Sequence, residues 1–136
     1  MKYNIVTGNP AVCVLALYIT DINYRIKQRR KEEIMCGIIG FTGNINAKEV
    51  LLQGLKALEY RGYDSAGISF FTEKGIKTIK AVGKVAGLAD KVSASSDETT
   101  KCGIGHTRWA THGGVSEINC HPHRYGKVTL IHNGII

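Results

Sequence analysis

The sequence has few of the features that mark secreted, membrane or nucleic-acid-binding proteins. Its four cysteines form no CxxC pair and follow no regular disulfide-type spacing, which is typical of a chain kept in a reducing compartment. The longest apolar stretch, residues 11–19, has about half the length that a membrane-spanning helix needs. No convincing signal-peptide cleavage site follows it. We therefore expect a cytoplasmic protein with no membrane partner.

The chain carries a net positive charge, but its basic residues do not follow the pattern of a nucleic-acid-binding protein. A net charge of +7 over 136 residues is compatible with anionic ligands. The sequence has no polybasic tail with interleaved aromatic residues, however, so we expect no nucleic-acid partner. The 43% hydrophobic content is ordinary for a folded protein, and the length suits one domain or part of one.

Residues 1–34 differ from the remainder of the chain. They combine a β-type run at residues 11–20 with a charged stretch at residues 25–33. This extension is either a leader or sequence that lies upstream of the true initiator, Met35, and we favour the second interpretation. The domain proper is then expected to begin at residue 35.

The chain also ends abruptly. Its last residues, Asn133-Gly-Ile-Ile136, lie just past an expected strand and are followed by no cap or polar tail. A natural domain seldom ends in this way. We therefore expect residues 35–136 to be the N-terminal portion of a domain that is truncated at its C-terminus.

From Cys36 onward, apolar periodicity and turn residues predict strands and helices. Asn46 followed by Glu49 resembles a capping box, and the apolar stripe after it keeps helical spacing up to a stop near Gly62. Strands are expected at residues 36–42, 66–71, 76–82, 103–110 and 127–132, with a shorter helix at 85–92. This order of elements predicts an α+β fold.

Cys36 is the first candidate for chemistry, because it directly follows Met35. A cysteine that becomes the first residue carries a nucleophilic thiol and its own base, an α-amine that is partly unprotonated near neutral pH. If the preceding residues stay attached, that nitrogen is an amide and the base is lost. The alternative interpretation is a buried core cysteine, which is common for this residue type.

The segment His106-Thr-Arg-Trp-Ala-Thr-His-Gly113 places a fixed cation among hydroxyls and imidazoles. The planar guanidinium of Arg108 suits a carboxylate, and Thr111 and His112 offer hydrogen-bonding groups close by. Alternatively, Arg108 ends a strand and packs its stem on Trp109. The segment alone leaves both interpretations open.

Asn133-Gly134 follows the last expected strand, where such a dipeptide is by default a turn. A side-chain amide and the next backbone N–H can also converge on one point in a pocket. Such a pair stabilises a developing oxyanion by about 3 kcal/mol per donor. Turn and oxyanion site both remain possible on these residues alone.

Five histidines lie between residues 106 and 132, so zinc must be considered. Cys120-His-Pro-His123 is the densest cluster of potential ligands, and Cys102 lies upstream. No pair of ligand doublets has the separation of a zinc finger or ribbon, however, and the proline stiffens the one cluster present. We expect no metal and no cofactor, with a small zinc- or anion-binding module as the alternative function.

Five strings together resemble the glutaminase domain of the glutamine–fructose-6-phosphate aminotransferase family, which belongs to the class II amidotransferases. The strings are Met35-Cys-Gly-Ile-Ile-Gly40, Leu58-Glu-Tyr-Arg-Gly-Tyr-Asp-Ser-Ala-Gly67, His106 to Gly113, His121-Pro-His123 and His132-Asn-Gly-Ile-Ile136. They occur in the family's order and spacing from Met35 to the end of the chain. The second and third strings are similar to the sugar-phosphate enzyme rather than to other class II members.

The resemblance implies a fold and a site. The fold is that of the N-terminal-nucleophile hydrolases, a four-layer α-β-β-α sandwich. The chemistry is glutamine hydrolysis through a thioester, with Cys36 as the nucleophile and its freed amine as the base. Asn133 and the Gly134 N–H would form the oxyanion hole. The substrate would be bound by four residues: Arg108, which holds the α-carboxylate, with Trp109, Thr111 and His112 around it.

The resemblance also implies partners and exposes two departures. Ammonia would pass to fructose-6-phosphate in isomerase domains that this chain lacks, and the full-length protein would be a homodimer. The 34 residues before Met35 are foreign to the family's usual start, and the chain ends before the aspartate that receives the glutamine α-amine. The chain alone is therefore not expected to make glucosamine-6-phosphate, and an inactive fragment is a further alternative.

Overall fold

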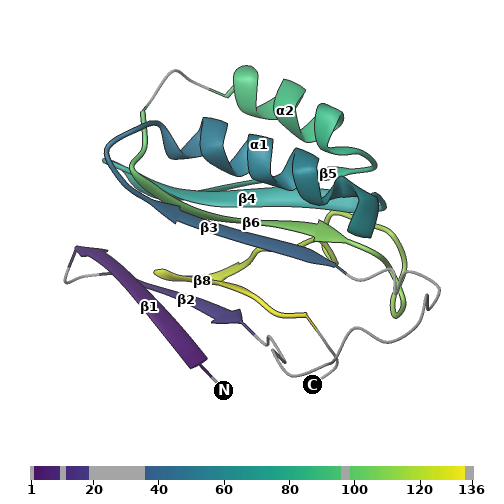
Figure 1. Cartoon of the computed structure of the whole chain (residues 1–136), viewed down its shortest axis with the longest axis horizontal. Helices are drawn as coiled ribbons and strands as arrows, with labels where there is room; N and C mark the ends of the chain where they lie inside the picture. The colour runs from purple at the N-terminus through teal and green to yellow at the C-terminus, as the bar shows by residue number, and fades with distance from the viewer. Residues whose placement is uncertain (1, 10–11, 19–35, 96–98, 134–136) are drawn as a thin grey trace, which may run out of the picture.

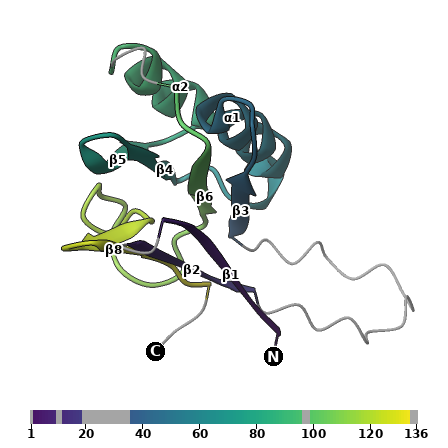
Figure 2. The ribbon, with the colours of Figure 1, turned by 90° about the vertical axis from the view of Figure 1, so that its left-hand side faces the viewer.

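The computed structural model describes residues 2–9, 12–18, 36–95 and 99–133. Two four-stranded β-sheets face each other, and two helices cover the outer face of one of them (Figure 1). The view turned by 90° shows the same succession of helices, first sheet and second sheet (Figure 2). The described residues thus form three layers, and the expected α+β fold is confirmed.

The helix-covered sheet has the strand order β3-β6-β4-β5, and all neighbouring strands are antiparallel. β4 and β5 form the predicted hairpin, in which Gly75 has a φ of 110° that suits glycine. β6 lies between β3 and β4, so segments distant in sequence meet along its two edges. The strands are β3 (Gly37–Thr42), β4 (Ser65–Thr72), β5 (Gly75–Val82) and β6 (Cys102–Arg108).

Helix α1 (Ala47–Leu58) begins where the sequence predicts. The side chain of Asn46 accepts a hydrogen bond from the Lys48 N–H at 3.3 Å and donates one to Glu49 at 3.1 Å. A 3-10 turn, η1 (Glu59–Arg61), follows and ends at Gly62. The local capping chemistry therefore fixes both ends of this element.

Helix α2 (Val85–Ser93) lies beside α1 over the same sheet (Figure 1). Apolar side chains spaced at helical intervals point from both helices into the core, where each buried side chain contributes about 1.5–3 kcal/mol relative to exposure. The buried members from the helices are Leu51, Leu55, Val85, Leu88 and Val92, and they pack against Ala66, Ile68, Phe70 and Ala81 of the sheet.

The second sheet has the order β1-β2-β8-β7. The antiparallel pair β1 (Lys2–Asn9) and β2 (Val12–Tyr18) joins the rest through a parallel pairing of β2 with β8 (Val128–Ile131). β7 (His123–Tyr125) pairs antiparallel with β8. A hydrogen bond of 3.0 Å from the Thr129 hydroxyl to the Ser69 hydroxyl links the two sheets across their interface.

Several expected boundaries need correction. The strand predicted at residues 103–110 ends at Arg108, because the next two N–H groups bond outside the sheet, to Cys36 and Asp64. His132, expected in a strand, lies just past β8. β1 and β7 were not predicted. Within the described ranges, no helix is long and apolar enough to span a membrane.

Candidate active site

The candidate site lies where three strands of the helix-covered sheet meet. β6 runs antiparallel to β3 and to β4, so its C-terminal end is adjacent to the start of both. Gly37 pairs with Thr107, and the Gly37 N–H donates to the Thr107 hydroxyl at 3.2 Å. This register brings Cys36, which directly precedes β3, beside Arg108 and Trp109 at the end of β6.

The thiol of Cys36 contacts the backbone of Trp109. The Trp109 N–H donates to Cys36 Sγ at 3.3 Å, and Sγ lies 3.6 Å from the Trp109 carbonyl oxygen. The thiol is half-buried and faces a cavity of about 290 Å³. Eleven residues line this cavity: Cys36, His106, Arg108, Trp109, Thr111, His112, Gly113, Asn119, His121, His123 and His132.

Arg108 organises the loop that forms one wall of the cavity. Its guanidinium donates to the carbonyl oxygens of His112, of Gly113 at 3.5 Å and of Gly114 at 3.1 Å. Asn119 adds a second donor to the Gly114 carbonyl at 2.9 Å. A guanidinium has five N–H donors, and the hydrogen bonds to this loop use three of them. The predicted neighbours Thr111 and His112 are exposed on the same loop.

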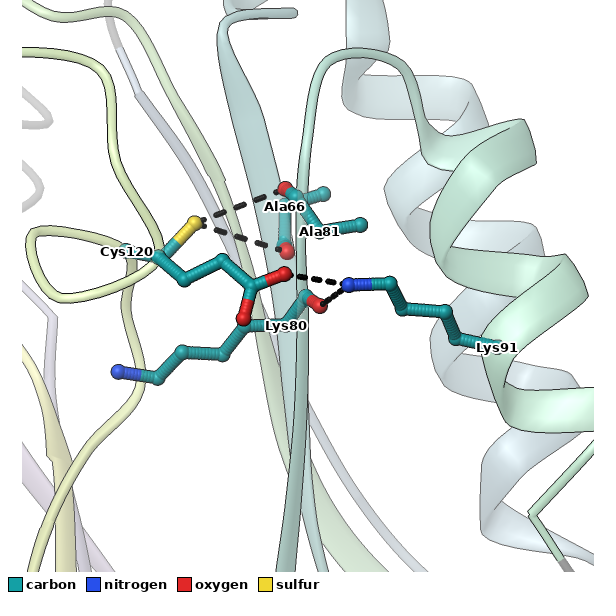
Figure 3. A network of polar contacts seen from close by, with 6 residues as sticks. Ala66, Lys80, Ala81, Lys91 and Cys120 are labelled. Atoms are coloured by element: carbon teal, nitrogen blue, oxygen red, sulfur yellow. Dashed lines mark hydrogen bonds and ion pairs between the residues drawn. The ribbon is translucent and has the colours of Figure 1, made fainter.

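The far end of this loop is held against β4 and β5, on the side of these strands that faces away from α2 (Figure 3). Cys120 is fully buried, and its sulfur lies 3.8 Å and 3.6 Å from the carbonyl oxygens of Ala66 and Ala81. Lys91 of α2 pairs with the loop residue Glu117 and donates to the Lys80 carbonyl at 3.0 Å. Burial raises the pKa of the Cys120 thiol.

Residues 62–64, which precede β4, hold the backbone of residues 108–110 in place. Asp64 accepts a hydrogen bond from the Ala110 N–H at 2.8 Å and donates its own N–H to the Arg108 carbonyl at 3.1 Å. Gly62 packs so closely that a Cβ there would lie 2.8 Å from the Trp109 nitrogen. The backbone that contacts the Cys36 thiol is therefore fixed by residues 62–64.

Three imidazoles line the cavity as a row of neighbouring rings. The ring centroids of His106 and His121 are 4.6 Å apart, and those of His121 and His123 are 4.3 Å apart. Burial lowers the pKa of His106 to about 4 and of His121 to about 3, and it lowers the pKa of His123 as well. Nearby positive groups add to these shifts. The row is therefore neutral at pH 7.

Asn133 lies beside the nucleophile candidate. Its side-chain nitrogen donates to the Cys36 carbonyl at 3.0 Å, and its side-chain oxygen lies 2.8 Å from His106 Nε2. The structure thus brings together Cys36, Arg108, Trp109, Thr111, His112 and Asn133, whereas Gly134 lies outside the described residues.

Sequence reasoning missed one lining residue and considered two others for a different role. Asn119 was not singled out, and its only signal is its place in the loop after Gly113. His121 and His123 were considered as zinc ligands. Across the described residues, no group of three or more His, Cys, Asp or Glu side chains is arranged to hold a metal ion.

Comparison with known proteins gives one consistent result. No protein-family model matches the chain. Over 104 residues, 75% of its length, the chain is 55% identical to glutamine–fructose-6-phosphate aminotransferase [isomerizing] of Bacillus subtilis (strain 168). The proteins of that name from Staphylococcus epidermidis and Geobacillus kaustophilus are 56% and 52% identical over the same length. The chain spans 17% of the length of these relatives.

Proposed function

Because the chain is homologous to the N-terminal part of glutamine–fructose-6-phosphate aminotransferases, we propose that it carries a glutaminase site with Cys36 as the nucleophile. The observation that supports this best is the position of one thiol. Cys36 Sγ opens onto a cavity that also holds Arg108 and Trp109, and an amide donor from Asn133 lies on the nucleophile's own carbonyl. A thiol can attack the side-chain amide of glutamine, a cation can bind its α-carboxylate, and an N–H donor can stabilise the oxyanion.

The proposed reaction has two stages. The Cys36 thiolate adds to the side-chain carbonyl carbon of glutamine, and the resulting oxyanion collapses to a thioester as the C–N bond breaks and protonated nitrogen leaves as ammonia. Water then adds to the thioester, and the C–S bond breaks to give glutamate and the free thiol. Each tetrahedral intermediate carries negative charge on oxygen, which side-chain and backbone N–H donors stabilise.

The proton acceptor in this proposal is the α-amine of Cys36. In the 136-residue chain that nitrogen is a peptide amide, because Met35 precedes it, and an amide nitrogen has no basic lone pair. We therefore propose that the working form has Cys36 as its first residue. Thiol and base then belong to one residue and need no further ordering.

Substrate binding is assigned to the loop that Arg108 organises. The guanidinium lies within the cavity wall and offers a planar pair of donors to an α-carboxylate. Thr111 and His112 stand exposed on this loop, with a distance of 3.3 Å between the Thr111 hydroxyl and His112 Nδ1. Gly134 completes the proposed oxyanion hole together with Asn133.

The remaining assignments extend the resemblance found in the sequence, and the homologues' names support glutamine and fructose-6-phosphate as substrates. We propose that the ammonia serves glucosamine-6-phosphate synthesis from fructose-6-phosphate in isomerase domains outside this chain, and that the complete protein is a cytoplasmic homodimer. The three described layers are compatible with the four-layer sandwich of N-terminal-nucleophile hydrolases, which we propose as the complete fold. The zinc-binding alternative has no candidate ligand set within the described residues.

The experiment that tests the proposal asks whether the Cys36 thiol needs a free α-amine for activity. A site-specific protease sequence in place of residues 30–35 allows the folded chain to be cut just before Cys36, so that β1 and β2 stay available to β8. We expect ammonia release from L-glutamine after cutting and none before. Equal activity of the uncut chain would show that another group accepts the proton.

A further inference from the structure

A short chain of hydrogen bonds connects three segments of the protein behind the candidate nucleophile. It begins at His106 in β6, passes through the side-chain amide of Asn133 after β8, and ends on the backbone carbonyl of Cys36 before β3. The two links measure 2.8 Å and 3.0 Å. The residues are 27 and 97 positions apart in sequence along the two links, so only the tertiary fold creates this contact.

The direction of both hydrogen bonds follows from the chemistry of the end groups. The Cys36 carbonyl can only accept, so the nitrogen of the Asn133 amide must face it. The amide oxygen then faces His106 Nε2, and because that oxygen also can only accept, Nε2 must carry the proton. Turning the amide over would place one carbonyl oxygen against another.

The surroundings of His106 agree with this tautomer. A neutral imidazole with a proton on Nε2 has a bare Nδ1, and His106 Nδ1 is buried with no hydrogen-bond partner among the residues that the structure describes. The ring is 1% exposed, and its strand lies between β3 and β4, where Ile38 and Gly67 are its register partners. The pKa of about 4 keeps the ring singly protonated at neutral pH.

We propose that His106 is a positioning residue that fixes the Asn133 amide with its NH2 group toward Cys36. An amide nitrogen has two N–H bonds. One is used on the Cys36 carbonyl, and the second is then held ready for the oxyanion that forms at the Cys36 thiol. His106 touches neither thiol nor substrate in this role. The inference rests on the proposed glutaminase function and deepens it.

The kinetic test compares two substitutions with a matched control, all in the chain cut before Cys36. His106→Phe keeps a planar ring but removes the donor, so the amide loses one of the two hydrogen bonds that set its direction. We expect kcat for glutamine hydrolysis to fall by about 10- to 100-fold with KM within about twofold, because only the transition state uses the second N–H. His106→Gln places an amide N–H near the former Nε2 and is expected to recover most of kcat.

The control is Thr129→Val, which removes an equally buried hydroxyl that bonds to Ser69 across the two sheets and to the His123 carbonyl, and which does not itself line the cavity. We expect it to lower stability and leave kcat within about twofold of the parent. A His106→Phe protein that keeps its kcat, or a Thr129→Val protein that loses kcat equally, overturns the positioning role. In the second case the loss reflects packing alone.

A second measurement needs no activity and uses the intact 136-residue chain. Nitrogen-15 NMR of the His106 ring is expected to show a proton on Nε2 and none on Nδ1 at pH 7, and the Asn133 side-chain NH2 signals are expected to shift in His106→Gln. A proton on Nδ1 overturns the assignment, even if the phenylalanine variant fails to fold. If the parent protein hydrolyses no glutamine, the proposed function and the positioning role of His106 in it both fail, while the tautomer still reports whether the amide direction is right.

Discussion

The sulfur of Cys36 lies 3.3 Å from the backbone nitrogen of Trp109, and the N–H between them points at the sulfur. The same contact ends strand β6, since the Trp109 N–H no longer bonds within the sheet. One contact therefore both ends the strand and holds the Cys36 thiol at the cavity.

We expect Cys36 to be the most reactive of the described cysteines toward alkylation. Its thiol is half-buried and opens onto the cavity, whereas burial raises the pKa of the thiols of Cys102 and Cys120. A raised pKa lowers the thiolate fraction and hence the rate. Peptide mapping by mass spectrometry after brief iodoacetamide treatment of the native chain measures the order. Faster labelling of Cys120 would contradict the described packing.

The buried imidazole of His106 should make stability depend on pH. Its pKa falls from 6.5 to about 4 on folding, so between these values the unfolded chain binds a proton that the folded chain does not. Stability is therefore complete above about pH 6.5 and is lost as the pH falls toward about 4. Relative to His106→Gln, the parent should lose about 2 kcal/mol of unfolding free energy between about pH 7 and about pH 5.

Urea unfolding of both proteins at several pH values measures this difference. The glutamine variant is the matched control, because the carboxylates of the chain titrate alike in both proteins. Parallel pH profiles for the two proteins would show that His106 is not neutral and buried in the folded state.

Gly62 should tolerate no side chain. A Cβ at this position would lie 2.7 Å from the Arg108 carbonyl carbon and 2.8 Å from the Trp109 nitrogen, and both are backbone atoms. We expect Gly62→Ala to lower the free energy of unfolding by about 1–3 kcal/mol and to move Trp109 away from the thiol. Gly87→Ala is the control, since the helix α2 glycine has open space around it. It should stabilise by about 0.5–1 kcal/mol.

Arg108 should contribute more to the free energy of unfolding than the exposed ion pair between Lys91 and Glu117 at the other end of its loop. Arg108→Lys replaces a fork that bonds three carbonyls by a single ammonium, and we expect a loss of about 2 kcal/mol together with faster hydrogen exchange in residues 112–114. Lys91→Met removes a solvent-exposed pair with Glu117 and should cost less than about 1 kcal/mol. Equal losses would contradict the described role of Arg108.

Local signals in the sequence were enough to predict most of the elements. The cap at Asn46, the stop near Gly62 and the turn at Gly75 each depend on residues within one or two turns, and all three are observed. Strand β7 was missed because its three residues, His123–Tyr125, have no apolar alternation and are held only by pairing with β8. Its existence is a tertiary effect.

The site was predicted as a set of residues but not as an arrangement. Cys36, Arg108 and Asn133 were singled out by their chemistry and their motifs, and the fold brings them together. The bonds from Arg108 to loop carbonyls and from His106 to Asn133 could not be anticipated. Both depend on the direction in which a side chain points from β6. The end of β6 is in turn set by the contacts of Trp109 with Cys36 and of Ala110 with Asp64, which are 73 and 46 positions apart in sequence.

The central claim is that the Cys36 thiol attacks glutamine, and the most direct measurement is ammonia release from L-glutamine by the chain cut before Cys36, compared with its Cys36→Ala variant. The parent should release ammonia and glutamate in equal amounts, while the alanine variant should release neither above the uncatalysed rate. Comparable ammonia release by both proteins would contradict the account.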